Sequence, residues 1–118
     1  MLSDFDRGLV VGVLLGEGSF GGDGRQPQIT LKLHVRRELL VRRLVELFPR
    51  TKLYGPYAHG GREFFQWMAR GRALVEDVLP VLDSAGVAEL DAYAAERLAS
   101  MRDRYSDYIG RVSPRTRP

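Results

Sequence analysis

The clearest pattern in the sequence is a strict alternation of apolar and polar residues in its second quarter. Apolar residues occupy every second position from Ile29 to Val35, and polar residues occupy the positions between them. A period of two is typical of a β-strand with one buried face. We therefore predict a strand over 28–35, whose outward side chains are long, polar and mildly basic: Gln28, Thr30, Lys32 and His34.

Helical spacing, aromatic runs and turn residues divide the rest of the chain. Helices are predicted over 4–16, 37–48, 72–82 and 88–108, and strands over 52–58 and 62–68. The large apolar rings Phe20, Phe48, Phe65 and Trp67 are expected in the core. The order predicts an α+β fold, αββαββα(α), with a four-stranded antiparallel sheet and helices on one face. Residues 1–109 would form the domain, and 110–118 a basic, flexible tail.

Gly8, Gly12 and Gly16 follow one another at intervals of four residues, so they share one stripe of the first predicted helix. A glycine inside a helix costs about 0.5–1 kcal/mol relative to alanine. A stripe without side chains lets another backbone approach closely. Two partners fit such a stripe: a second copy of the helix, which would create a twofold interface, or a strand of the chain's own sheet.

Glu17 directly follows this stripe. A carboxylate at the C-terminal end of a helix opposes the helix dipole, so it is unfavourable unless a cation compensates it. Two such carboxylates meeting at a twofold axis would call for a metal, and oxygen ligands suit Mg²⁺. The alternative is an ordinary exposed glutamate in a loop.

Charge is distributed unevenly along the chain. Residues 25–72 carry eleven Lys and Arg against three acids, whereas residues 73–109 carry three against eight. A basic middle predicts a face that binds a polyanion, although a solvated surface with accidental clustering would look the same. No apolar run reaches the roughly 20 residues of a membrane span, and cysteine is absent from the sequence. We expect an intracellular, cytoplasmic or nucleoid-associated protein.

A family resemblance joins these features. The stretch GLVVGVLLGEGSF at 8–20 resembles the LAGLIDADG motif of homing endonucleases in its form ending Gly-Glu-Gly-Ser-Phe. PQITL at 27–31 is similar to the family's second strand, and LYGPY at 53–57 with FQW at 65–67 to its third and fourth strands. The resemblance covers about residues 4–82 in order.

The resemblance implies a homodimer that binds double-stranded DNA, with Mg²⁺ or Mn²⁺ at the dimer axis and neither a membrane nor a small-molecule substrate. Glu17 would be the catalytic metal ligand, and His34 would be either a catalytic-pocket group or a plain DNA contact. The dimer interface would contain Gly8, Gly12, Val13 and Gly16. The residues expected to bind DNA are Arg25, Gln28, Thr30, Lys32, His34, Arg36, Arg37, Tyr54, Arg62 and Gln66.

The sequence departs from the family pattern at three places. Leu15 stands where an acid is usual, the hairpin between Glu17 and Gln28 is short, and residues 80–89 lack the expected Lys or Arg. Three functions therefore stay open: a metal-dependent homing endonuclease of an intron or intein, a DNA-binding regulator with weak or lost cleavage, and an unrelated α+β interaction protein.

Overall fold

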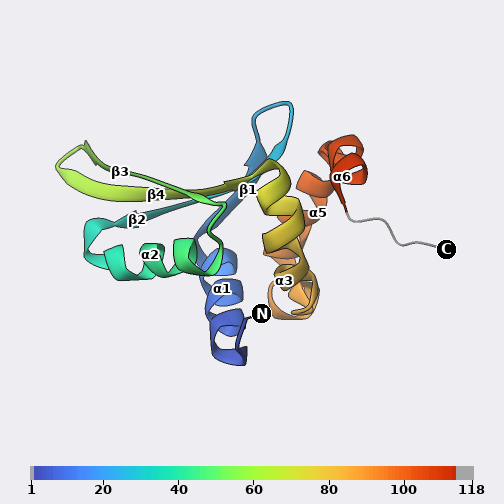
Figure 1. Ribbon diagram of the computed structural model, residues 1–118, viewed down its shortest axis with the longest axis horizontal. Helices are drawn as coiled ribbons and strands as arrows, with labels where there is room; N and C mark the ends of the chain where they lie inside the picture. Colours follow the sequence, from blue (N-terminus) through green and yellow to red (C-terminus); the bar gives the residue numbers. More distant parts are fainter. Residues whose placement is uncertain (1, 114–118) are drawn as a thin grey trace.

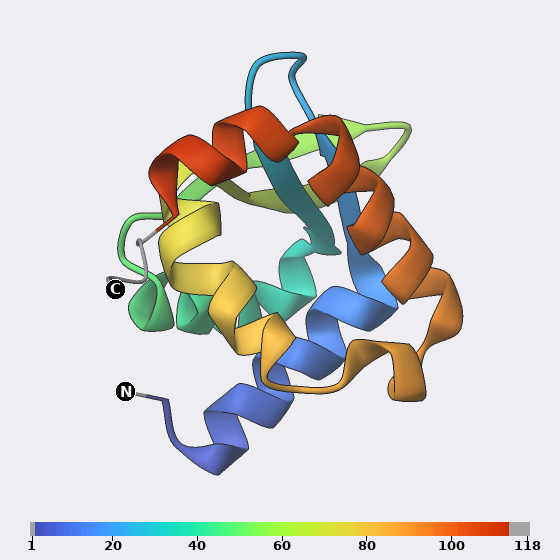
Figure 2. The same ribbon diagram turned by 90° about the vertical axis from the view of Figure 1, so that its right-hand side faces the viewer.

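A computed structural model describes residues 2–113 of the chain. Four antiparallel strands form one sheet in the order β1-β2-β4-β3, and helices α1, α2, α3 and α5 gather on one of its faces (Figures 1 and 2). The strands are β1 (Gly18–Gly22), β2 (Pro27–His34), β3 (Lys52–His59) and β4 (Arg62–Arg70). The helices are α1 (Asp4–Glu17), α2 (Glu38–Leu47), α3 (Leu79–Asp83), α4 (Val87–Leu90), α5 (Ala92–Arg104) and α6 (Ser106–Val112).

Helix α1 begins where the sequence predicts. The Ser3 side chain accepts a hydrogen bond from the Asp6 amide, which satisfies one of the free donors of the first turn. The buried Asp6 carboxylate accepts two hydrogen bonds from Arg43 of α2. This ion pair ties the start of α1 to α2, while Val10 and Leu14 of α1 are completely buried.

The alternation in β2 produces the predicted division of faces. Pro27, Ile29, Leu31 and Leu33 are buried, and the side chains between them are half-buried or exposed. Strand β2 pairs with β1 on one side and β4 on the other, so it is a central strand. Cross-strand partners point to the same face of a sheet, so the alternation of buried and outward residues in β2 continues in the neighbouring strands.

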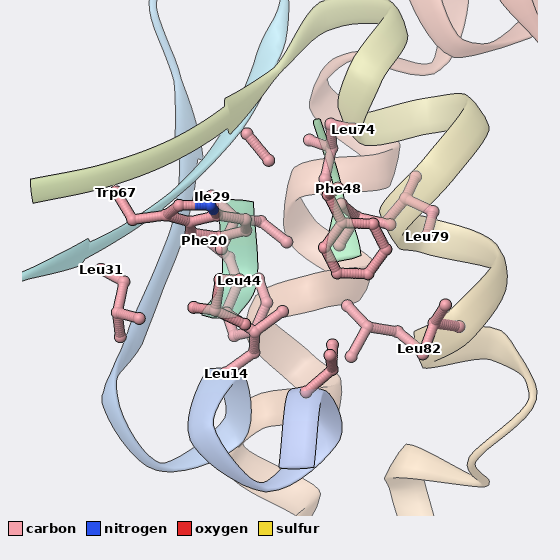
Figure 3. Close-up of a cluster of buried hydrophobic side chains, with 14 of the residues drawn as sticks. Leu14, Phe20, Ile29, Leu31, Leu44, Phe48, Trp67, Leu74, Leu79 and Leu82 are labelled. Carbon is pink, nitrogen blue, oxygen red and sulfur yellow. The ribbon is translucent and has the colours of Figure 1, made fainter. Parts of the chain in front are cut away.

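The core lies between the sheet and the helices. Figure 3 shows Leu14 of α1 beneath Leu44, Phe20 and Ile29, with Leu74, Leu79 and Leu82 from the third helical region beside them. The prediction that Phe20, Phe48, Phe65 and Trp67 lie in the core is confirmed, because all four rings are buried. The Trp67 indole donates a hydrogen bond to the Thr51 hydroxyl, so its polar edge is satisfied.

The predicted third helix exists, but a π-helical segment, Ala73–Val78, precedes α3. The prediction of one helix over 88–108 is wrong, because the chain forms α4, α5 and α6 there. Asp91 has an extended backbone and its carboxylate caps α5, which separates α4 from α5. Between α5 and α6 the buried Tyr105 leaves the helical conformation.

Helix α6 continues to Val112, inside the segment 110–118 that was predicted as a tail. Residues 114–118 of that tail lie outside the described part of the chain. None of the helices within residues 2–113 has the length and apolar character needed to cross a membrane.

The burial of two leucines predicts a difference in their effect on stability. Leu14 is completely buried, whereas Leu39 on α2 is 86% exposed. Leu14→Ala should lower the free energy of unfolding by about 2–5 kcal/mol, because it leaves a cavity under the sheet. Leu39→Ala is the matched control, with an expected change within about 0.5 kcal/mol. Denaturant unfolding measures both, and equal losses would contradict the assigned packing of α1.

Candidate functional site

The sheet face opposite the helices is open and carries no acid among the described strand residues. Cross-strand pairing places Lys32 beside Gln66, Thr30 beside Met68 and Gln28 beside Arg70. The predicted outward orientation of Gln28, Thr30, Lys32, His34 and Gln66 agrees with their exposure. The complete open-face set is Ser19, Gly21, Gln28, Thr30, Lys32, His34, Lys52, Tyr54, Tyr57, His59, Arg62, Phe64, Gln66, Met68 and Arg70.

Several of these residues were missing from the sequence prediction. Lys52, His59 and Arg70 add basic groups, and Phe64 and Met68 add an apolar centre. The parity of β4 could have identified Phe64, Met68 and Arg70, since they alternate with the buried Phe65, Trp67 and Ala69. Alternation along β3 could not have identified the outward residues of that strand, because its register shifts between Tyr54 and Tyr57.

Basic side chains concentrate at the end of the sheet where β2 stops and the β3–β4 hairpin turns. Arg36 and Arg37 lie in the short 3-10 turn Val35–Arg37 after β2, and Arg62 begins β4. His34, Arg36, Arg37 and Arg62 line one surface pocket there. The structure thus brings together four of the predicted DNA-binding residues.

Arg25 lies at the opposite end of the sheet, in the loop between β1 and β2. The Asp23 carboxylate accepts hydrogen bonds from the amides of Gln26 and Arg25, which hold the pKa of Asp23 below its usual value. The Tyr105 hydroxyl accepts a third hydrogen bond, from the Gly24 amide. These bonds fix the loop that carries Arg25 against the C-terminal helices (Figure 1).

The glycine stripe of α1 points away from its own sheet. A Cβ at Gly8, Gly12 or Gly16 would meet no atom of residues 2–113 within 4 Å. Val13 beside the stripe is only half-buried, and Phe5 at its start is 78% exposed. Of the two coverings left open by the sequence, the chain's own strands are therefore excluded.

An apolar groove accompanies this stripe on the surface. The groove is lined by Gly8, Val11, Gly12, Leu15, Ala85 and Leu90, together with Asp4 and Arg7. Leu90 is 65% exposed at its edge. Nothing in the sequence of 83–91 indicated this placement, because it arises only when α4 packs beside α1.

Glu17 is the last residue of α1 and is exposed. The next residue, Gly18, pairs with Leu31, so Glu17 stands beside the middle of β2. Continued by one residue, this register would set Glu17 level with Lys32, two positions before His34 and roughly 7 Å from it along the strand. Within residues 2–113, Glu17 forms no ion pair.

The oxygen chemistry of Glu17 suits a hard divalent cation. A protomer alone offers an incomplete site, because no cluster of three His, Cys, Asp or Glu exists in the described part of the chain. A complete oxygen shell would therefore need ligands from elsewhere, such as a second Glu17, phosphate oxygens or water.

The stretch 80–89, in which the sequence lacks the expected basic residue, lies away from Glu17. Ser84 accepts a hydrogen bond from Arg7, in the N-terminal half of α1. The C-terminal end of α1 instead has Arg97 of α5 nearby, which lines a small cavity with Leu15, Gly18 and Ser19. Arg97, which the sequence prediction did not name, is therefore a basic residue near the C-terminal end of α1, in a cavity that Glu17 itself does not line.

Solved structures with this fold are homing endonucleases. The chain matches I-CeuI, a group I intron-encoded homing endonuclease complexed with DNA, with a TM-score of 0.66 and 17% identity over 87% of this chain and 55% of that one. It matches the homing endonuclease I-TnaI with a TM-score of 0.58 and 15% identity, over 90% and 94% of the two chains. It matches the LAGLIDADG homing endonuclease I-SmaMI bound to cleaved DNA with a TM-score of 0.59 and 16% identity, over 100% of this chain and 51% of that one.

This chain therefore spans about half the length of I-CeuI and I-SmaMI, and nearly all of I-TnaI. No family model matches the sequence, and no curated protein matches it. Identities this low establish the fold alone. The predicted resemblance and the predicted α+β sheet architecture are confirmed at that level.

Alanine substitutions at Gly21 and Gly22 of β1 test whether Tyr105 holds the β1–β2 hairpin in place. A Cβ at Gly22 would overlap the ring of Tyr105, which is buried and hydrogen-bonded to Gly24, whereas a Cβ at Gly21 would meet nothing. Gly22→Ala should lower the free energy of unfolding by about 1–3 kcal/mol, because Tyr105 must move. Gly21→Ala should change it by less than about 0.5 kcal/mol. Thermal unfolding measures both, and a harmless Gly22→Ala would show that Tyr105 does not brace the loop.

Proposed function

Because the chain has the fold of the LAGLIDADG homing endonucleases, we propose that it is a homodimeric, sequence-specific, double-stranded DNA-binding protein that cleaves a near-palindromic site with a divalent metal. The observation that carries this proposal is the open sheet face, which holds basic and amide side chains and no acid among its described residues. I-CeuI, of the same fold, is complexed with DNA. Acting on cellular DNA implies an intracellular, cytoplasmic or nucleoid location, and mobility of an intron or intein is the corresponding biological role.

The sheet would lie in the major groove, which admits a β-ribbon. Gln28 and Gln66 suit adenine N6 and N7, Lys32 suits guanine O6 and N7, and Thr30 can serve either kind of edge. Tyr54 lies on the same face beside Gln66. Arg25, Arg36, Arg37 and Arg62 are at the two ends of the sheet, where they would contact phosphates and set the register.

A second copy would cover the glycine stripe of α1. The stripe and its groove are apolar and uncovered in the protomer, while Phe5 and Leu90 add exposed apolar surface. A twofold axis along α1 would bring Gly8, Gly12, Val13 and Gly16 of both copies together. The two sheets would then form a continuous surface for a site with matching halves.

The same axis would bring the two Glu17 carboxylates together. Mg²⁺ or Mn²⁺ bound between them would supply water activation and charge stabilisation for phosphodiester hydrolysis. Glu17 of each copy would hold the metal, because its carboxylate forms no ion pair within residues 2–113 and stays open to a metal ion. Arg97 lies at the same end of α1 and would face negative charge on the DNA backbone.

A second function is a dimeric DNA binder that does not cleave, such as a regulator. The observation that favours it is that residues 80–89, where a basic residue is expected, carry no Lys or Arg, and that Ser84 within this stretch contacts Arg7 in the N-terminal half of α1. Both functions share the DNA-binding face and the dimer. They differ only in whether the strands break when metal is added.

The proposed dimer predicts a sharp difference between two helical glycines. Gly12 on α1 and Gly110 on α6 both have room for a side chain within the protomer. Gly12→Leu should therefore leave the fold intact but force two α1 helices apart, converting the dimer to a monomer. Gly110→Leu should leave the dimer unchanged. Sedimentation velocity measures the mass, and a fully dimeric Gly12→Leu protein would eliminate the α1 interface.

The proposed metal site predicts the effect of removing one charge. Glu17→Gln should reduce cleavage at least a hundredfold while leaving DNA binding within about twofold, because the amide oxygen is a poor metal ligand. Glu89→Gln, at an exposed position on α4, is the matched control. The substrate is a site selected from a random duplex library, incubated with and without Mg²⁺. Undiminished cleavage by Glu17→Gln would remove it from the mechanism, and intact strands with wild-type protein would favour the regulator.

A further inference from the structure

The two histidines of the chain lie in one pocket. His34 ends β2 and His59 ends β3, and both line a surface cavity of about 330 Å³ with Lys32, Arg62 and Phe64. They are 25 positions apart in the sequence, so only the pairing of the strands joins them. Leu33 and Glu63 complete the lining.

Strand register explains how the pocket is built. His34 pairs with Phe64 and His59 pairs with Arg62, so the two histidines stand on two successive rows of the open face. Phe64 is the half-buried floor, with the Lys32 ammonium 5.7 Å from its ring centre and the Tyr57 ring 5.7 Å away on the other side. The pocket is therefore an apolar base surrounded by nitrogen donors.

The hydrogen bonding of His34 defines its neutral form. Its Nδ1 accepts a hydrogen bond of 3.1 Å from the Arg36 amide. Nδ1 is then unprotonated in the neutral ring, and Nε2 carries the N–H. His34 can thus donate from Nε2 while it caps the turn, but adding a proton at Nδ1 would break that cap. His59 has no such bond among the described residues, so it can gain a proton without this cost.

The charge around the two imidazoles is strongly positive. Lys32 comes from β2, Arg36 and Arg37 from the turn after it, and Arg62 from β4; the adjoining pocket shares His34 and Arg62. Glu63 is the one acid that lines either cavity. None of these four cations forms an ion pair within residues 2–113. Like charges oppose protonation of an imidazole, and an anion placed between them reverses that effect.

We propose that this pocket binds a phosphate group of the DNA backbone and takes up a proton when it does so, mainly on His59. The proposal deepens and rests on the proposed DNA-binding function. The single negative charge of a phosphodiester would offset part of the positive charge of Lys32 and Arg62, and its oxygens would accept hydrogen bonds from imidazole N–H groups. Since a protonated imidazole binds an anion more strongly than a neutral one, DNA affinity should rise as the pH is lowered from about 8 to about 6.

The experiment compares DNA affinity at about pH 8 and about pH 6 at one salt concentration, on either side of the ordinary imidazole pKa. Using a metal-free duplex, the wild-type protein should bind roughly tenfold more tightly at the lower pH, within the limit of about a hundredfold that one fully linked proton would give over two pH units. His59→Gln should remove most of that gain, and the double variant with His34→Gln should remove nearly all of it. Lys52→Gln, on the same face but outside the pocket, should weaken binding equally at both pH values. An unchanged pH dependence in the double variant would overturn the proposal.

A second probe separates this proposal from the proposed function. Sulfate is a tetrahedral dianion whose charge is constant over this pH range. In the wild-type protein, sulfate should shift the NMR resonances of both histidine rings and move the titration of His59 to higher pH. If duplex DNA does not bind but sulfate produces these changes, the result supports the anion site and contradicts the proposed DNA-binding function. If sulfate leaves both rings unperturbed, the pocket is not an anion site.

Discussion

The two-sided packing of α1 is the constraint on which the rest of this molecule depends. Val10 and Leu14 on one side are completely buried beneath the sheet, and Asp6 anchors the helix to Arg43 of α2. The opposite side is a row of glycines at which a side chain would meet nothing else in the described part of the chain. Because the buried side is fully used by the core, the bare side is left for another molecule, and Glu17 is held at the edge of the sheet.

The same core orients the open face of the sheet. Alternate residues of β2 and β4 enter the core, so the residues between them must point outward, and pairing aligns them in rows. The C-terminal helices add to this by holding the β1–β2 loop through Tyr105. A rigid surface of this kind suits the reading of base edges, which needs donors and acceptors held at defined positions.

Parts of the candidate site could be predicted from the sequence because they follow from a local period. Lys32 and Gln66 are outward for the same reason that Leu31 and Trp67 are inward. Other parts depended on packing between distant segments. Arg97 reaches the end of α1 only because the chain breaks at Asp91 and α5 runs back along β1, and this break is a single capping interaction within a sequence that otherwise has continuous helical character.

The sequence by itself determined the order of the elements, the parity of the central strand and the glycine stripe with Glu17 at its end. These are properties of neighbouring residues, since a side chain's face depends on the period of its own helix or strand. Only the tertiary structure decided that the stripe is uncovered, that residues 80–89 lie away from Glu17 and that His34 and His59 share one pocket. Each of these depends on which segments meet, and that is set by the packing of the whole core rather than by any local pattern.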